Sequence, residues 1–201
     1  MIAIIDYDAG NIMSVQKAVL KLNEEYVLTR DADTIMNSDK LILPGVGAFG
    51  DAMDRIRKYN LEEVIKRFVA TGKPFLGICL GLQLIFEESE ETEGVKGLAL
   101  LPGKIRRIPV GEYVKIPHMG WNSLKFPNKG KLFEGIAEDS YVYFVHSYYL
   151  DATNKNDVVA TTDYNVTIDA AVEHDNIYAC QFHPEKSGEL GLKIIENFIR
   201  L

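Results

Sequence analysis

Hydrophobic and polar positions follow two alternating patterns in the first half of the chain. Short apolar or β-branched runs, the pattern of buried parallel strands, occupy residues 2–6, 26–30, 40–45 and 75–78. Between some of these runs, apolar residues recur every three or four positions, as they do on one face of a helix. We therefore expect helices after Asn11, over residues 60–71 and over residues 80–89.

Local signals predict where two of these helices begin and end. Asn11 is a candidate N-cap, and Asn60 with Glu63 resembles a capping box. Gly72 stands where a helix commonly stops, with Pro74 just beyond it.

The pattern changes from about Gly94 onward, where strands dominate. The expected strands are residues 104–108, 141–149, 157–163, 168–174 and 177–183, and a final helix covers 189–201. Strands that alternate with helices imply right-handed crossovers and a parallel sheet. We predict an α/β fold in one domain spanning residues 1–201. Its central, mostly parallel sheet is flanked by helices, and the β-rich second half extends the sheet or packs beside it.

Composition and charge narrow the class of protein. The 201 residues are 47% hydrophobic and 25% charged, which is ordinary for a globular protein. A formal net charge of −7 and scattered basic residues argue against nucleic acid or an anionic membrane as partner. The first residues do not resemble a signal peptide, and no apolar run is long enough to span a membrane. We expect a cytoplasmic protein with reduced thiols.

Metal binding and cofactor binding are not predicted. The two cysteines and four histidines are dispersed, without the close pairs that zinc sites use. The segment GVGAFG does not follow a dinucleotide-binding pattern convincingly.

Cys79 stands in Gly-Ile-Cys-Leu-Gly, between the strand at 75–78 and the helix expected after it. A nucleophile at such a corner sits in a strained turn that needs small neighbours, and Gly77 and Gly81 are in the right places. The alternative is that Cys79 is a small buried hydrophobe, the usual role of a free cysteine. The strand-then-helix context favours a nucleophile.

A thiol nucleophile needs a base, and the base needs an orienting group. His183 stands just after the strand residues IYACQF (177–182), and Glu185 lies two residues beyond His183. If that strand is parallel to 75–78, the pair reaches the same edge of the sheet as Cys79. The alternative is a solvated loop histidine, which suits His174 better. His146 and Cys180 lie inside strands and are more typical of core positions.

Three ordered motifs then carry a family resemblance: PGVGAFG at 44–50, GICLGLQ at 77–83 and HPE at 183–185. They resemble the class I, or triad, glutamine amidotransferases, whose fold is flavodoxin-like. PHMGWN at 117–122, YFVHSYY at 143–149 and FHPEKSG at 182–188 are similar to one branch of that family. That branch comprises the glutaminase subunits of imidazole glycerol phosphate synthase, in histidine biosynthesis.

The resemblance implies a role for each motif residue. Cys79 attacks the carboxamide carbon of L-glutamine and forms a glutamyl thioester. His183 protonates the departing ammonia and then activates water, while Glu185 holds the imidazole. The backbone amides of Leu80 and Val46 are expected to hold the oxyanion.

The same resemblance implies a set of substrate contacts. Gln83 lies one helical turn beyond Cys79 and is expected to face the substrate. Glu91 is a candidate partner for the α-ammonium group, or else belongs to a solvated acidic helix end. The full expected substrate set is Gly45, Gly47, Gln83, Glu91 and the backbone of His146, Ser147 and Tyr148.

A partner protein is also implied, because ammonia must reach an acceptor before it is protonated and the chain leaves no room for an acceptor domain. The resemblance names a (β/α)₈-barrel cyclase subunit in a heterodimer that makes imidazole glycerol phosphate and aminoimidazole carboxamide ribotide. Without it we expect a poor glutaminase. Trp121 is either an interface residue or an ordinary core residue. The interface candidates are Asn11, Met119, Trp121, Tyr143 and Lys186.

Three alternatives stay open at this point. The chain could serve anthranilate, aminodeoxychorismate or pyridoxal phosphate synthesis, although the pyridoxal branch has a PGGES-like segment and the chorismate branches lack HMGWN. It could be a cysteine hydrolase on a related scaffold, whose base would stand closer to Cys79 in sequence. A non-catalytic interaction module is disfavoured by the intact Cys79, His183 and Glu185.

Overall fold

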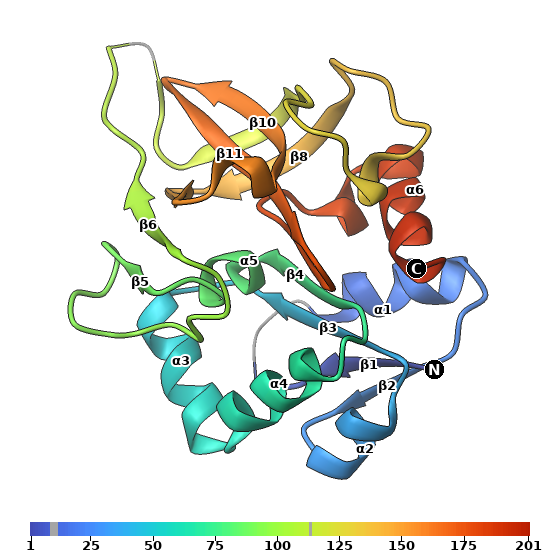
Figure 1. The fold of residues 1–201 in the computed structure, drawn as a ribbon. Helices are drawn as coiled ribbons and strands as arrows, with labels where there is room; N and C mark the ends of the chain where they lie inside the picture. The colour runs from blue at the N-terminus through green and yellow to red at the C-terminus, as the bar shows by residue number, and fades with distance from the viewer. Residues whose placement is uncertain (9–11, 113) are drawn as a thin grey trace.

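Five parallel strands form one half of a ten-stranded sheet, seen in a computed structural model that describes residues 1–8, 12–112 and 114–201. Their order is β2-β1-β3-β4-β12 (Figure 1). These strands are β1 (Ile2–Ile5), β2 (Tyr26–Thr29), β3 (Lys40–Gly45), β4 (Phe75–Cys79) and β12 (Ile177–Cys180). Because β3, β4 and β12 are parallel neighbours, their carboxyl ends meet at one edge of the sheet.

Strands from the second half of the chain continue the sheet in largely antiparallel fashion. Beyond β12 the order is β11-β9-β6-β5, and β10 pairs with β11. These strands are β5 (Glu88–Ser89), β6 (Gly103–Arg107), β9 (Tyr148–Ala152), β10 (Val158–Tyr164) and β11 (Val166–His174). Strands β7 (His118–Ser123) and β8 (Tyr141–His146) form a separate two-stranded antiparallel sheet.

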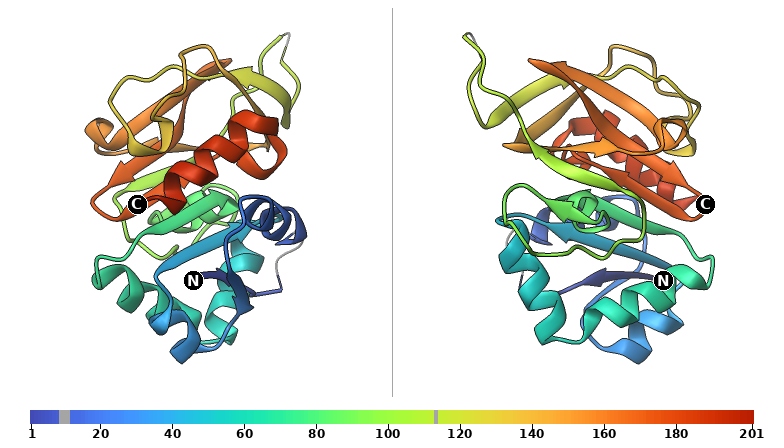
Figure 2. Two further views of the ribbon diagram at one scale, coloured as in Figure 1. Left: turned by 90° about the vertical axis from the view of Figure 1, so that its right-hand side faces the viewer. Right: turned by 60° about the vertical axis from the view of Figure 1, so that its left-hand side comes forward.

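Helices cover both faces of the parallel half, as the side chains of its strands alternate between two cores (Figures 1 and 2). On β1, Ala3 and Ile5 pack toward α2 (Ala32–Asn37), α3 (Phe49–Lys58) and α4 (Leu61–Ala70). Ile2 and Ile4 pack toward α1 (Ile12–Lys21) and α6 (Gly188–Ile199). The remaining helical turns are α5 (Leu80–Leu84), η1 (Lys131–Phe133), η2 (Lys155–Asp157) and η3 (Pro184–Lys186).

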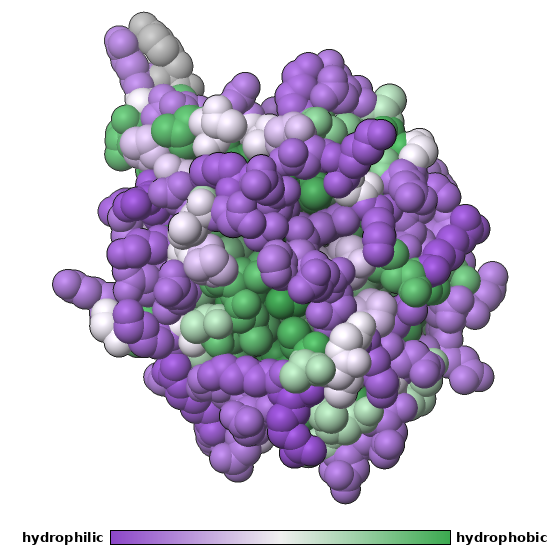
Figure 3. Space-filling view, in the orientation of Figure 1, coloured by the Kyte–Doolittle hydropathy of each residue, from purple (hydrophilic) through white to green (hydrophobic). Residues whose placement is uncertain are grey.

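The surface is dominated by polar side chains around an apolar patch near the centre of the face shown in Figure 3. Within the described parts of the chain, no helix is both long and apolar enough to cross a membrane.

The predicted fold class is confirmed: an α/β fold with a helix-flanked sheet and a β-rich second half that extends it. Gly72 also ends a helix as expected, with a φ of +78° and its N–H bonded to the carbonyl of Val69. The predicted N-cap Asn11 lies outside the described residues.

The helix expected over residues 80–89 is wrong in length. Helix α5 ends at Leu84, and the chain then enters β5. The carbonyls of Leu84 and Ile85 accept hydrogen bonds from the N–H groups of Leu98 and Leu100. These carbonyls would be the hydrogen-bond acceptors of a longer helix, but they bind a neighbouring segment instead.

Two other local expectations are also wrong. The strand expected over residues 141–149 breaks at Ser147, because β8 joins the two-stranded sheet and β9 joins the large one. Asn60 does precede a helix, but its φ is +55° and its side chain makes no capping bond. The hydrophobic pattern did not predict helices α2 and α3 or strand β7. In α2, the side chain of Asp31 caps the helix by accepting from the N–H of Thr34.

Candidate active site

The corner between β4 and α5 holds Cys79 in a strained backbone conformation. Its φ is +54° and its ψ is −107°, outside the regions that L-residues favour. Both flanking glycines are required by close packing. A Cβ on Gly77 would lie 2.8 Å from the carbonyl oxygen of Gly81, and a Cβ on Gly81 would lie 1.9 Å from that of Leu43. The thiol is thereby presented at the carboxyl edge of the sheet.

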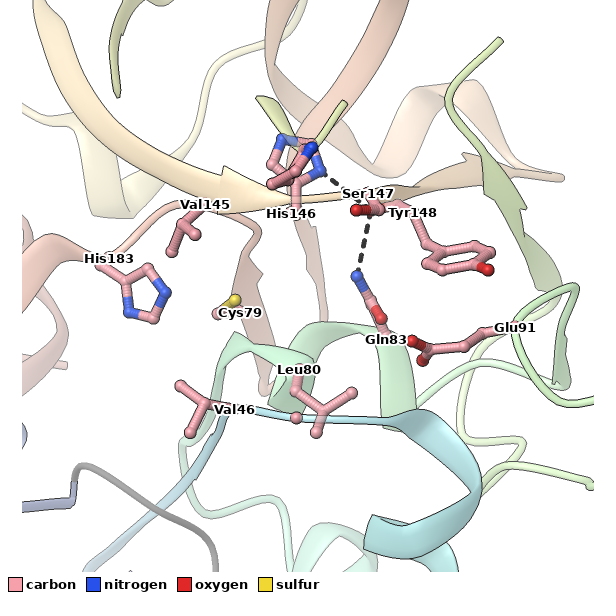
Figure 4. Close-up of a pocket in the computed structure, with 12 residues that line it drawn as sticks. Val46, Cys79, Leu80, Gln83, Glu91, Val145, His146, Ser147, Tyr148 and His183 are labelled. Carbon is pink, nitrogen blue, oxygen red and sulfur yellow. Dashed lines mark hydrogen bonds between the residues drawn. The ribbon is translucent and has the colours of Figure 1, made fainter. Parts of the chain in front are cut away.

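His183 and Glu185 reach the same edge from the end of β12. Strand β12 is parallel to β4, with Cys180 opposite Ile78. His183 Nδ1 lies 2.7 Å from Glu185 Oε1, and both side chains are only 2% exposed. The Glu185 carboxylate must accept, so the Nδ1 nitrogen carries the proton and Nε2 is left to face Cys79 (Figure 4).

The electrostatics of His183 favour an imidazolium beside the sulfur. Burial lowers the pKa of His183, but the adjacent Cys79 sulfur and the Glu185 carboxylate outweigh it and raise the pKa to about 9. A protonated imidazole beside the sulfur is a positioned general acid for a group bound there.

A cavity of about 360 Å³ opens over Cys79. His183 and Val145 lie on one side of the sulfur, and Gln83 and Glu91 lie on the other (Figure 4). The lining is Val46, Gly47, Cys79, Leu80, Gln83, Glu91, Pro117, Val145, His146, Ser147, Tyr148 and His183. Its volume is at the lower end of the range for small-molecule sites.

The segment after β3 supplies the wall beside the nucleophile. Gly45 pairs with Cys79 in the β3–β4 register, and Val46 and Gly47 then line the cavity. Gly47 has a φ of +104° with open space around it. Leu80 is the first residue of α5, so the helix itself does not use its N–H.

The family model described as Glutamine amidotransferase class-I matches residues 3–201 of this chain. The chain belongs to the class I glutamine amidotransferases. It is 52% identical over 201 residues to "Imidazole glycerol phosphate synthase subunit HisH" of Methanothermobacter thermautotrophicus, covering 100% of this chain and 98% of that protein. A relative of the same name from Methanocaldococcus jannaschii is 49% identical over 201 residues, covering 100% of both chains.

Solved structures agree on the fold of this amidotransferase. "Structure of PurLQS from Thermotoga maritima" superposes with a TM-score of 0.74 at 21% identity, covering 99% of this chain and 97% of that one. At that identity the likeness concerns the fold alone.

Most predicted substrate residues of the amidotransferase line the cavity, but two have structural contacts that the sequence did not indicate. Gly45 does not line the cavity; a Cβ there would lie 2.3 Å from the hydroxyl of Tyr7, so packing requires this glycine. Glu91 lines the cavity, yet its Oε2 accepts from the N–H of Phe49 at the start of α3. It does not belong to an acidic helix end, because α5 has already ended.

The predictions that Cys180 and His146 occupy core positions are confirmed. Cys180 is fully buried, and burial raises its pKa well above the ordinary value, so this thiol stays protonated. His146 is buried, and its Nδ1 donates to the carbonyl of Tyr148 at 2.9 Å. His174 ends β11 and is exposed.

Four of the interface candidates fall within the described residues, and each is at least partly exposed. Met119 is 66% exposed and Trp121 is 55% exposed, so Trp121 is not a core residue. Tyr143 is opposite Trp121 in the β7–β8 register, and its carbonyl accepts from the N–H of His183. Lys186 is half-buried in η3, and Asn11 lies outside the described residues.

The sequence did not indicate the contacts of two buried polar residues, Gln181 and His118. Gln181 is fully buried with its Nε2 3.7 Å from the Cys79 sulfur, and His118 is bonded to His146. The register that places Gln181 beside Cys79 depends on β4 and β12 being neighbours, which the sequence pattern does not specify.

Proposed function

We propose that this chain is the glutaminase subunit of an imidazole glycerol phosphate synthase. The observation that carries the proposal is the Cys79 thiol, held in a strained corner and facing the His183–Glu185 pair inside a cavity of amino-acid size. Full-length identity of about 50% to relatives of that name supports this branch of the family over the others. We place the enzyme in the cytoplasm, with the rest of histidine biosynthesis.

In the proposed reaction the Cys79 thiolate attacks the carboxamide carbon of L-glutamine. The new C–S bond displaces the C=O electron pair onto oxygen, and the N–H groups of Leu80 and Val46 bind the resulting oxyanion. The His183 imidazolium donates its Nε2 proton to the nitrogen, so the C–N bond breaks with neutral ammonia as leaving group. A glutamyl thioester remains on Cys79.

Hydrolysis then uses the same groups in reverse. His183, now neutral, takes a proton from water while the oxygen attacks the thioester. Collapse of the second tetrahedral intermediate breaks the C–S bond, releases glutamate and restores the thiolate–imidazolium pair. Glu185 holds the ring with Nδ1 protonated throughout, because its Oε1 accepts at 2.7 Å.

The far end of the cavity is suited to the amino-acid moiety of the substrate. Glu91 offers a carboxylate to the α-ammonium group, and Gln83 lies between Glu91 and the sulfur (Figure 4). His146, Ser147 and Tyr148 also line the cavity, and we expect their backbone groups to contact the substrate. Gly47, with its positive φ, belongs to the loop that bears the second oxyanion donor.

A cyclase subunit with a (β/α)₈ barrel is proposed to cover the cavity mouth and receive the ammonia. Exposed Met119 and Trp121 on β7 offer an apolar contact of the kind found at interface centres. The carbonyl of Tyr143 accepts from the N–H of His183, and Lys186 directly follows Glu185 in η3. The ammonia would combine with the phosphoribulosyl-formimino ribotide substrate to give imidazole glycerol phosphate and aminoimidazole carboxamide ribotide.

The test is a glutaminase assay on the purified chain, alone and with a barrel-type cyclase and its nucleotide substrate. We expect slow glutamate release by the isolated chain and at least about tenfold faster release in the liganded complex, because the Gly45–Gly47 segment can reorient. Cys79→Ala in the same complex should give no glutamine-dependent product, while added ammonia should still be used. Equal glutamate release with and without the liganded cyclase contradicts the proposed coupling, and no complex formation contradicts the proposed branch.

A further inference from the structure

A chain of buried hydrogen bonds runs beneath the cavity and ends at the nucleophile. The Nε2 of Gln181 lies 3.7 Å from the sulfur of Cys79, within the range of an N–H···S bond. The Oε1 of Gln181 accepts from the Nε2 of Gln83 at 3.0 Å, and that nitrogen also donates to the carbonyl of Tyr148 at 3.1 Å. Gln181 is 0% exposed and Gln83 is 5% exposed, so solvent does not satisfy these groups.

We call the hydrogen bonds from Tyr148 through Gln83 and Gln181 to Cys79 the first arm of this network. The carbonyl of Tyr148 fixes the direction of every hydrogen bond in the first arm. A backbone carbonyl can only accept, so Gln83 must present its NH₂ group to Tyr148. The same NH₂ faces Gln181, which must therefore turn its oxygen toward Gln83. The NH₂ of Gln181 is then left pointing at the sulfur of Cys79. The donor at the sulfur is thus set by a group on another strand.

A second arm bonds to the same carbonyl. The Nδ1 of His146 donates to the Tyr148 carbonyl at 2.9 Å, so the Nε2 of His146 carries no proton in the neutral ring. The Nδ1 of His118 lies 3.0 Å from that Nε2 and must be the donor. The Nε2 of His118 then accepts from Asn122 at 3.5 Å.

The second arm is held rigidly by its surroundings. The ring of His118 stacks between Tyr164, at a centroid distance of 3.8 Å, and Phe144, at 4.8 Å. The Nδ2 of Asn122 also donates to the carbonyl of Asp163 at 3.0 Å, which fixes the orientation of that amide. Protonation of either histidine would place a donor against a donor, so the arm requires both rings to be neutral.

We propose that Gln181 is a further catalytic residue that donates a hydrogen bond to the Cys79 thiolate, and that His118 is a positioning residue that secures this donor through His146 and the Tyr148 carbonyl. The sulfur is then stabilised from two directions, by His183 and by Gln181. Helix α5 has only five residues, so direct donors to the sulfur carry more of this task than the helix does. The contribution to glutamine hydrolysis rests on the proposed function, but the contact with the sulfur does not.

The two donors to the sulfur, the Gln181 amide and the His183 imidazolium, have different roles during the reaction. The bond from Gln181 is strongest while the charge is on sulfur and weakens as the sulfur electron pair forms the C–S bond. An amide cannot deliver a proton at neutral pH, so His183 stays the acid and base. Loss of the donor should therefore lower the reactivity of the thiol without changing which groups titrate in the reaction.

The first test is the rate at which iodoacetamide alkylates Cys79 at pH 7, followed by peptide mass spectrometry to separate it from buried Cys180. Gln181→Met keeps the length of the side chain and removes the donor. A hydrogen bond to a charged group affects an equilibrium at least about tenfold, so we expect alkylation about tenfold slower. Gln181→Glu places a carboxylate against the sulfur and should be slower still. Rates within twofold of the unaltered protein for both variants would overturn the proposal.

The second test separates positioning from packing at His118. His118→Phe keeps the stacked ring and loses the donor to His146, whereas His118→Asn keeps a donor near the Nδ1 position and loses the stack. We expect slower alkylation of Cys79 in His118→Phe and recovery toward the original rate in His118→Asn, even if the asparagine variant melts at a lower temperature. Equal rates in the two variants, or rates that follow the melting temperature, would overturn the positioning role. If Gln181→Met does not fold, the comparison of His118→Phe with His118→Asn still tests whether the hydrogen-bond network affects the reactivity of Cys79.

Failure of the proposed function has a different signature. If the unaltered chain releases no glutamate with the liganded cyclase, yet Gln181→Met still slows alkylation, the glutaminase assignment fails and the sulfur contact stands. If glutamate is released normally and neither Gln181→Met nor His118→Phe changes alkylation, the contact fails and the glutaminase assignment stands.

Discussion

Acid should destabilise this protein through two buried histidines that must stay neutral. Burial lowers the pKa of His118 to about 4. Burial also lowers the pKa of His146 to about 3, against a smaller opposite effect of its bond to Tyr148. In the unfolded chain both rings titrate near the ordinary value of about 6.5. The unfolded state therefore binds protons that the folded state excludes, and stability falls as the pH drops from about 6.5 toward 4.

The size of the effect follows from these shifts. Between pH 7 and pH 4.5, a histidine that stays neutral when folded contributes a loss of about 2.5 kcal/mol in the free energy of unfolding. We assign that value to His146 and about 1.5 kcal/mol to His118, because fewer protein atoms surround His118 and nearby solvent screens its charge more. The total, about 4 kcal/mol, is a large share of a typical stability of about 5–15 kcal/mol.

The contribution of His183 to stability changes with pH in the opposite direction and in a different pH range. Its folded pKa of about 9 lies above the unfolded value, so its contribution is fully present below pH 6.5 and is lost as the pH rises toward 9. It does not change in the acid window. Stability should therefore decline on both sides of about pH 6.5.

Urea unfolding at several pH values between 4.5 and 7 measures the effect. His118→Phe should lower stability at pH 7, where His146 loses a partner, and should reduce the loss between pH 7 and 4.5 by about 1.5 kcal/mol. Val142→Ala, a cavity in the fully buried core of β8, should lower stability equally at every pH. If His118→Phe and the unaltered protein lose the same free energy on acidification, the inferred neutral pair is wrong.

Three further predictions concern the corner that holds Cys79 and the surface of the protein. Cys79→Gly should be about 1 kcal/mol more stable than Cys79→Ala in urea unfolding, because only glycine is relaxed at a φ of +54°, and equal stabilities would contradict the strain. Gly81→Ala should cost about 2–3 kcal/mol and abolish glutaminase activity, since its Cβ would meet the Leu43 carbonyl at 1.9 Å. Gly72→Ala, with a positive φ but open space, should cost about 1 kcal/mol and keep activity; similar effects at both glycines would refute the packing argument. Trp121→Ala should change the free energy of unfolding by less than about 0.5 kcal/mol yet weaken cyclase binding in calorimetry by about 2 kcal/mol or more, and unaltered binding would refute the interface role.

The elements that depend on local pattern were predictable from the sequence. Strands β1, β3 and β4 follow apolar runs, because burial on both faces leaves little room for polar residues. The edge strand β2 is less buried and was predicted from its short β-branched run. The Cys79 corner was predictable because only glycines fit beside it, and Gly77 and Gly81 are visible as such in the sequence. The pairing of His183 with Glu185 followed from their spacing beyond a strand.

Elements whose ends depend on neighbours were not predictable. Helix α5 stops at Leu84 because N–H groups of the segment around Leu98 donate to the carbonyls at the end of the helix. That segment is not a sequence neighbour of the helix. Strands β8 and β9 read as one run, although they separate at Ser147 and join different sheets. The sequence predicts Glu91 as a substrate contact or as part of an acidic helix end, and neither reading indicates that Glu91 accepts from the N–H of Phe49 at the start of α3.

The sequence alone therefore determined the fold class, and it pointed to Cys79 as the nucleophile and to His183 and Glu185 as its partners, because these predictions depend on residue type and short spacing. That the whole chain forms one amidotransferase domain stays a prediction. Only the tertiary structure decided which polar groups share the core with the nucleophile. Gln181 and His118 lie far from Cys79 in sequence and reach it through the β4–β12 register and the single carbonyl of Tyr148. A buried polar group must find its partner wherever the folded chain places one, and that position is a property of the packed sheet.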